Sequence, residues 1–129
     1  MSLQVIETIP IFRIFDLKKA REFYIDYLGF AMDWQHQFAG QGPVYMQISR
    51  SGCVLHLSEH YGDCCPGSTV FLRVSGIEDY HRELSTKGYA YLNPEVEKTF
   101  HDSLSLQLTD PFGNRLRLDE ALEKQGTQH

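Results

Sequence analysis

The sequence contains an internal duplication, and this feature constrains the fold more than any other. The segment FRIFDLKKAREFYIDYLGF, at positions 12–30, aligns with LRVSGIEDYHRELSTKGY at 72–89. The shorter segment VLHLSE, at 54–59, aligns with RLRLDE at 115–120. Both offsets are close to half the length of the chain, which has 129 residues. The sequence therefore predicts two copies of one structural unit.

Hydrophobic periodicity gives the first copy a strand, a helix and three further strands. Residues 9–15 are expected to form a strand, with Pro10, Phe12 and Ile14 on one side and Ile9, Ile11 and Arg13 on the other. Asp16 is a suitable N-cap for a helix whose apolar residues recur at helical spacing, and Gly29 is placed to end that helix. The remaining strands are expected near 31–37, 44–49 and 54–58.

The second copy has the same order of elements. Its helix is expected over 77–86, with Gly88 ending it, and its later strands near 90–93, 103–109 and 115–119. The segment DPFGN, which joins the last two strands, has Pro and Gly where tight turns favour them. The chain therefore reads as an α+β fold of two βαβββ modules, each with a helix on the apolar face of its sheet. The other face of each sheet is polar, which fits either a solvated surface or the lining of a wet cleft.

Length and composition favour one globular domain over residues 1–124, with module one at about 5–62 and module two at about 66–122. Residues 125–129 are expected to form a polar tail. The net charge of −5 argues against binding to nucleic acid or to an anionic membrane surface. No apolar run is long enough for a membrane helix, and no signal peptide is recognisable. The odd number of cysteines, three, favours a cytoplasmic protein without a disulfide framework.

Two motifs resemble the glyoxalase, bleomycin-resistance and extradiol-dioxygenase superfamily, whose fold is called vicinal oxygen chelate. These motifs are DLKKAREFYIDYLGF, at 16–30, and TDPFGNRLRLDE, at 109–120. The resemblance covers residues 8 to 120. It implies curled mixed sheets around a concave cleft, a homodimer, and metal ligands on the first and last strands of each module in the members that use a metal.

The resemblance places the four metal-ligand positions at Ile9, His56, Thr69 and Arg117. Only His56 fits such a position, because Ile9 has no donor atom and Arg117 is a permanent cation. The loop that follows His56 contains further metal-binding residue types at Glu59, His60, Asp63, Cys64 and Cys65. Their spacing matches no zinc motif, although adventitious metal binding in residues 56–65 stays open. We therefore expect no metal, no cofactor and no catalytic residue.

The metal-free members that the sequence most resembles are the bleomycin-resistance proteins, which sequester an antibiotic without catalysis. Such a function needs aromatic walls and acidic groups for a flat, cationic ligand. The candidate ligand-binding residues are Trp34, Phe38, Tyr45, His56, Glu59, Phe100, Arg115 and Arg117. The aromatic residues could instead pack in the core, and the arginines would suit an anionic ligand better. Two alternatives stay open, namely a metal-dependent enzyme of the glyoxalase, lyase or dioxygenase type and a dimeric scaffold or regulator.

Overall fold

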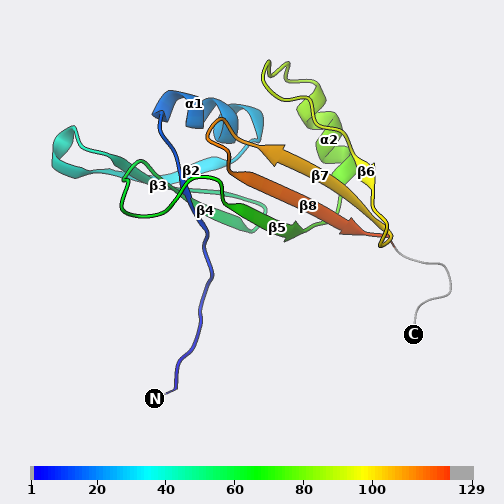
Figure 1. The fold of residues 1–129 in the computed structure, drawn as a ribbon, viewed down its shortest axis with the longest axis horizontal. Helices are drawn as coiled ribbons and strands as arrows, with labels where there is room; N and C mark the ends of the chain where they lie inside the picture. The colour runs from blue at the N-terminus through cyan, green and yellow to red at the C-terminus, as the bar shows by residue number, and fades with distance from the viewer. Residues whose placement is uncertain (1, 123–129) are drawn as a thin grey trace. The chain divides into compact units, whose positions relative to one another are not determined.

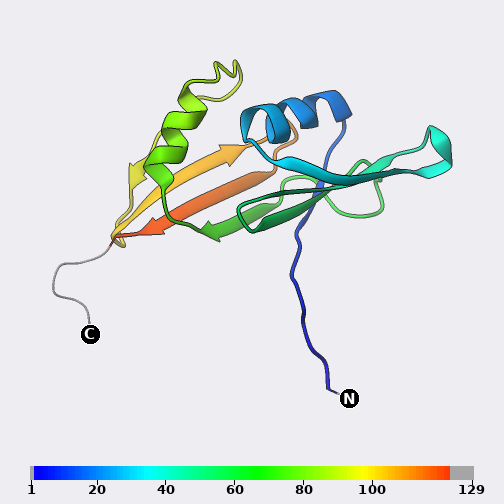
Figure 2. The same ribbon diagram turned by 180° about the vertical axis from the view of Figure 1, so that it is seen from behind.

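A computed structural model describes residues 2–122 and divides the chain into two compact units between Ser68 and Thr69. Each unit contains one sheet of four strands and a helical segment (Figure 1 and Figure 2). The order of elements is the predicted βαβββ pattern in both units, so the expected fold class is confirmed. The predicted polar tail at 125–129 lies outside the described residues.

Unit 1 has a mixed sheet with the strand order β1-β4-β3-β2. Strand β1 pairs in parallel with β4, and the other neighbours are antiparallel. The strands are β1 (Ile11–Arg13), β2 (Ala31–Gln37), β3 (Val44–Arg50) and β4 (Cys53–Ser58). A short 3-10 turn, η2 (Phe38–Gly40), joins β2 to β3. Strand β1 is shorter than the predicted strand at 9–15, and its hydrogen bonds to β4 end at the carbonyl of Pro10 and the N–H of Ile14.

The helical segment of unit 1 begins as α1 (Leu17–Arg21) and continues as a wider π-helical segment, η1 (Glu22–Tyr27). The Asp16 side chain accepts a hydrogen bond from the backbone of Lys19 at 3.0 Å, which confirms the predicted N-cap. Gly29 follows the segment with a φ of 83°, a conformation that favours glycine. The face toward the sheet carries the buried residues Ala20, Phe23, Tyr24 and Tyr27.

Alternation along the strands of unit 1 separates an apolar face from a polar one. Met46 and Ile48 of β3 and Leu55 and Leu57 of β4 are buried. Residues of the opposite parity, such as Gln47, face away from this core. The helical segment covers the apolar face (Figure 1). The polar face of the sheet is therefore left for the candidate site described below.

Unit 2 repeats this arrangement with the strand order β5-β8-β7-β6. Its elements are β5 (Thr69–Arg73), α2 (Ile77–Ser85), β6 (Glu97–Lys98), β7 (Ser103–Thr109) and β8 (Arg115–Ala121). Helix α2 begins where predicted, and Gly88 follows it with a φ of 66°. Within residues 2–122, no helix is long and apolar enough to cross a membrane.

The pairing registers of the two units match. Ile11 lies opposite His56 in the parallel pair of unit 1, and Phe71 lies opposite Arg117 in that of unit 2. The sequence alignment of the two copies matches these two pairs. Residues that align in the sequence therefore occupy equivalent positions in the two sheets.

The strand predicted near 90–93 is wrong. The structure places that element at Glu97–Lys98, where it pairs with Leu104 and Ser105 of β7. Pro94 lies between the two positions and has no N–H to donate to a ladder. Its carbonyl instead accepts a hydrogen bond from His81 of α2 at 2.9 Å, so this segment is attached to the helix.

The predicted turn between the last two strands is confirmed in detail. Both backbone N–H groups of Phe112 and Asn114 donate to Asp110 Oδ1 at 2.8 Å. The side-chain amide of Asn114 donates to the other carboxylate oxygen at 2.9 Å. Asp110 and Asn114 are buried, so these side chains hold the turn together from the inside.

Candidate functional site

Three ring-bearing side chains meet on the polar face of the sheet in unit 1. The rings of Trp34 and Tyr45 are nearly parallel, with centroids 6.0 Å apart and an interplanar angle of 11°. The imidazole of His56 packs edge-on against both, at 5.4 Å from Trp34 and 5.1 Å from Tyr45. Trp34 remains 44% exposed, so part of its indole is open to a second flat molecule. We call this group the aromatic face.

A bulge in β2 brings Trp34 onto this face. The pairing with β3 shifts between Met32 and Trp34, so that Asp33 is an extra residue in the strand. Trp34 then lies opposite Gln47, while the Asp33 carboxylate also reaches the polar face and bonds to Gln47 and Ser49. The bulge thus places an indole and a carboxylate side by side on the same face.

A chain of hydrogen bonds runs through the polar face from Tyr45 to Asp33. The hydroxyl of Tyr45 is 2.7 Å from His56 Nδ1, and His56 Nε2 is 3.0 Å from Gln47 Oε1. Gln47 Nε2 donates to Asp33 Oδ2 at 3.0 Å, and Ser49 Oγ donates to Asp33 Oδ1 at 3.0 Å. Both ring nitrogens of His56 are therefore engaged by side chains of β3.

Burial keeps the two titratable side chains of the aromatic face neutral. Desolvation lowers the pKa of His56 from its ordinary value of 6.5, although the negative charge of Glu7 opposes this shift. Desolvation also raises the pKa of the Tyr45 phenol, with Asp63 and Cys64 adding to it. At neutral pH the face presents a neutral imidazole and a protonated phenol.

An open hollow of about 420 Å³ lies in the same unit, lined by Phe38, Pro43, His60 and Asp63. Phe38 is 47% exposed and packs edge-on against His36 at 4.6 Å. The Asp63 carboxylate is close enough to Tyr45 to raise its pKa, which relates the hollow to the aromatic face. The hollow therefore combines an exposed aromatic ring with an acidic group.

Glu59 has a structural contact rather than an open carboxylate. Its Oε1 accepts a hydrogen bond from the backbone N–H of Val44 at 3.0 Å, and the Glu59 backbone donates to the Val44 carbonyl at 2.9 Å. Glu59 therefore helps to fasten the start of β3 to the end of β4.

The loop after β4 is organised by contacts to the carboxylate of Asp63. Ser58 Oγ donates to Asp63 Oδ2 at 2.6 Å, and His60 Nδ1 is 3.6 Å from Asp63 Oδ1. Burial raises the pKa of Cys64, so its thiol is held protonated. Within residues 2–122, no group of three or more His, Cys, Asp or Glu residues is placed to hold a metal ion.

The other three candidate residues belong to unit 2. Phe100 is fully exposed and packs against His101 with centroids 4.9 Å apart. Arg117 donates to Gln107 at 3.2 Å across β7 and β8. Arg115 is exposed and lies opposite Thr69 and Thr109. The structure thus brings Trp34, Tyr45 and His56 together in unit 1, while these three residues lie on the second sheet and its loop.

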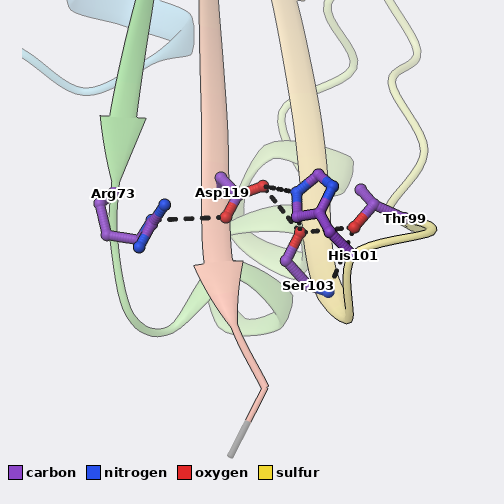
Figure 3. Close-up of polar contacts among 5 residues, drawn as sticks. All are labelled: Arg73, Thr99, His101, Ser103 and Asp119. Carbon is purple, nitrogen blue, oxygen red and sulfur yellow. Dashed lines mark hydrogen bonds and ion pairs between the residues drawn. The ribbon is translucent and has the colours of Figure 1, made fainter.

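Unit 2 contains a polar cluster of its own at the start of β7 and the end of β8 (Figure 3). Ser103 Oγ donates to Asp119 Oδ2 at 2.7 Å and is 3.1 Å from His101 Nε2. Arg73 Nε lies 3.5 Å from Asp119 Oδ1, and Thr99 Oγ1 is 2.7 Å from Ser103 Oγ. The hydrogen bond from Ser103 is the main cause that lowers the pKa of Asp119, with His101 and Arg73 contributing.

This cluster has the residue types of a serine hydrolase but not the arrangement. Ser103 is 1% exposed and its proton goes directly to the carboxylate of Asp119, so no substrate can reach an activated hydroxyl. The cluster therefore stabilises the end of the sheet.

Several residues of these networks are not among the eight candidate ligand-binding residues that the sequence gives. Gln47 was recognisable as part of the polar face from the alternation in VYMQIS, but its partner could not be identified. Asp33 reaches that face only because of the bulge, for which the sequence has no glycine or other signal. His101 and Ser103 precede and begin β7, where alternation alone does not reveal their buried partner Asp119.

Comparison with solved structures supports the fold. A glyoxalase-related enzyme from Clostridium phytofermentans superposes with a TM-score of 0.71 at 17% identity, covering 93% of this chain and 98% of that one. A bleomycin resistance determinant encoded on the transposon Tn5 gives a TM-score of 0.70 at 18% identity, with 92% and 100% coverage. The antibiotic-binding protein TnmS3 from Streptomyces sp. CB03234 gives 0.67 at 21% identity, with 93% and 100% coverage. At these identities the similarity shows the fold alone.

The sequence itself gives the family. No curated protein matches the chain significantly. A family model described as glyoxalase superfamily protein matches residues 2–125, which is nearly the whole sequence and includes both modules. The chain therefore belongs to the glyoxalase superfamily.

Proposed function

We propose that this protein binds and sequesters an antibiotic of the bleomycin type, or a related ligand that carries a flat ring system, without catalysis. The observation that carries the proposal is the aromatic face of Trp34, Tyr45 and His56, with Trp34 stacked on Tyr45 and still 44% exposed. A flat ring system can stack on such an indole at little cost in conformational entropy. Two fold relatives, an antibiotic-binding protein and a bleomycin resistance determinant, support the same interpretation.

The charges of unit 1 favour a ligand with positive charge. Asp33 borders the aromatic face, Asp63 lines the hollow, and Glu7 is near enough to His56 to affect its pKa. The guanidinium of Arg13 lies over the ring of Phe15, at 4.6 Å from its centroid, and is directed to that contact. Several carboxylates would therefore attract a planar cation that binds to unit 1.

The state of His56 supports binding rather than metal-dependent catalysis. Its two ring nitrogens are hydrogen-bonded to Tyr45 and Gln47. A metal ion at either nitrogen would displace one of these bonds and would break the chain that ends at Asp33. The loss of this hydrogen bond disfavours metal binding by His56, which is the residue that fits a metal-ligand position of the family.

We infer that the protein acts as a homodimer. Residues 2–8 are exposed and form no helix or strand, and the segment extends away from the sheet of unit 1 (Figure 1). Leu3, Val5 and Ile6 in this segment are 87%, 71% and 91% exposed. A second copy packed on this segment would bury three neighbouring apolar side chains, and that burial would favour the dimer.

A cytoplasmic location fits the cysteine chemistry. Cys53, Cys64 and Cys65 are all free thiols. Burial raises the pKa of Cys53 and of Cys64, which keeps them protonated and slow to oxidise. A reducing compartment is therefore proposed for this protein.

Calorimetric titration with metal-free bleomycin tests the proposed function. We expect saturable binding by the wild type, and at least a fivefold loss in Trp34→Ala because stacking on an aromatic side chain contributes about 1–3 kcal/mol. Tyr91→Ala is the matched control, since Tyr91 is 82% exposed in unit 2 and should leave affinity unchanged. Absence of binding, together with near-stoichiometric zinc, iron, nickel or manganese in the purified protein, would favour the metal-dependent enzyme instead.

A further inference from the structure

The chain of hydrogen bonds on the polar face has a direction, and Asp33 sets it. An ionised carboxylate only accepts hydrogen bonds. Asp33 therefore requires Gln47 to present its amide N–H to Oδ2, as it does at 3.0 Å. The reversed amide would place the Gln47 carbonyl oxygen against the carboxylate and lose that bond.

The orientation of Gln47 fixes the tautomer of His56. With its nitrogen directed at Asp33, Gln47 offers only its oxygen to His56, at 3.0 Å from Nε2. The ring must then carry its proton on Nε2, which leaves Nδ1 as an acceptor. Both nitrogens are satisfied only in this tautomer.

The tautomer of His56 in turn orients the hydroxyl of Tyr45. The phenol must donate its single proton to Nδ1, which is 2.7 Å away. Because that proton is used, the Tyr45 oxygen can only accept a further hydrogen bond, through its lone pairs. Tyr45 is half-buried and its ring stacks on Trp34 with centroids 6.0 Å apart, so this oxygen belongs to the aromatic face.

We propose that Asp33 and Gln47 are positioning residues that make the Tyr45 hydroxyl an obligate hydrogen-bond acceptor, so that the aromatic face selects planar ligands with an N–H or O–H donor at their edge. The proposal rests on the proposed function for its ligand, but the hydrogen-bond direction exists in the protein alone. An edge acceptor, such as a ring oxygen, would oppose the lone pairs of Tyr45 and leave both groups unsatisfied.

The substitution Asp33→Asn separates the direction of the chain from its geometry. Asparagine has nearly the same shape as aspartate but can donate to the Gln47 oxygen. Gln47 can then turn its amide and donate to His56 Nε2, the proton moves to Nδ1, and the Tyr45 hydroxyl becomes free to donate outward. In this variant, every hydrogen-bonding group from residue 33 to Tyr45 has a partner whichever way the chain of hydrogen bonds runs. The variant should therefore populate both tautomers of His56.

Nitrogen-15 NMR of the histidine rings in the full chain, without any ligand, tests the direction. The His56 signals are assigned by their loss in His56→Gln. We expect one tautomer in the wild type at pH 8, protonated at Nε2, and a mixture in Asp33→Asn. Ser49→Ala is the control, since it removes the other partner of the carboxylate, at 3.0 Å, but keeps its charge. An Nδ1-protonated wild type, or an unchanged tautomer in Asp33→Asn, would overturn the proposal.

The selectivity is measured with indole and benzofuran, which have the same shape and differ in a ring N–H and a ring oxygen. A buried donor–acceptor mismatch costs about 1–3 kcal/mol, so the wild type should bind indole at least fivefold more tightly. Asp33→Asn should reduce this ratio, and Tyr45→Phe should abolish it. Equal binding or no binding of the two probes by the wild type would refute the selectivity. Bleomycin binding in the calorimetric test would stand or fall independently, because neither the tautomer nor the ratio of the probes depends on it.

Discussion

Arg73 lies opposite Asp119 in the parallel pairing of β5 and β8, and its Nε is 3.5 Å from the buried carboxylate. The equivalent position of unit 1 pairs Arg13 with Ser58, whose hydroxyl donates to the carboxylate of Asp63 at 2.6 Å. Each unit thus places an arginine, a hydroxyl and a carboxylate near the end of its parallel strand pair. In unit 2 the acid is on the strand, and in unit 1 it is on the following loop.

Asp119 should make the stability of the protein depend on pH. Its pKa in the folded protein is lowered, chiefly by the hydrogen bond from Ser103, relative to an ordinary value of 3.8. The stabilisation is therefore complete above that ordinary pKa and is lost as the pH falls through the lower folded pKa. Urea unfolding between pH 7 and pH 2 should show that acidification lowers the free energy of unfolding less in Asp119→Asn than in the wild type. Asp79→Asn, at an exposed site on α2, is the control and should retain the wild-type profile.

His56 should titrate below the ordinary histidine range. Desolvation lowers its pKa from 6.5, so the folded state disfavours the proton and loses stability as the pH falls below 6.5 through the folded pKa. Tyr45→Phe removes a donor to the neutral ring at 2.7 Å and should move the pKa upward. Proton NMR titration measures both values. Tyr61→Phe, beside His60 at 5.3 Å, should leave the His56 pKa unchanged, and a wild-type pKa above 6.5 would contradict the account of burial.

Removal of the Asp110 side chain should destabilise unit 2. Asp110→Ala would leave the N–H groups of Phe112 and Asn114 without their acceptor, and Asn114 is buried. The expected loss is about 1–3 kcal/mol of the free energy of unfolding, measured by urea denaturation. Glu95→Ala, at an exposed loop position, should cost little by comparison. A loss no larger than that of this control would show that the turn forms without its side-chain bonds.

The N-terminal segment should determine the oligomeric state. Replacement of Leu3, Val5 and Ile6 by serine removes the exposed apolar surface of residues 2–8 without touching either sheet. Sedimentation equilibrium should show a dimer for the wild type and a monomer for the triple variant. A monomeric wild type, or a variant that remains fully dimeric, would contradict the proposed role of this segment.

The elements that the sequence predicted well are those with a local signal. Asp16 was expected to cap the first helix and does so, because a carboxylate near the first free N–H groups needs no information from the rest of the chain. The turn at DPFGN and the strict alternation of SLSLQLT were likewise sufficient for β7 and β8. The sequence alignment of Arg13 with Arg73 also holds in the structure, where the two residues occupy equivalent positions in the parallel strand pairs.

The features that the sequence did not predict depend on partners far away in the chain. The segment at 90–93 resembles a strand, but Pro94 and the bond to His81 attach it to α2. Asp33 reaches the polar face through a bulge that arises from its pairing with β3. The residues of the aromatic face could be predicted from the sequence only as separate candidates. The contact between Trp34 and His56 was not predictable because Trp34 follows the bulge in β2 and His56 is on β4, with β3 between them.

Trp34 is the only tryptophan of the chain, so its fluorescence reports directly on the aromatic face. Titration of the full chain with metal-free bleomycin, followed through tryptophan emission, is the most direct test of the proposed binding function. The account predicts a saturable change in emission with the same dissociation constant as calorimetry, and loss of that binding in Tyr45→Ala. Binding that leaves the emission of Trp34 unchanged, or no binding at all, would contradict the assignment of this face as the ligand site.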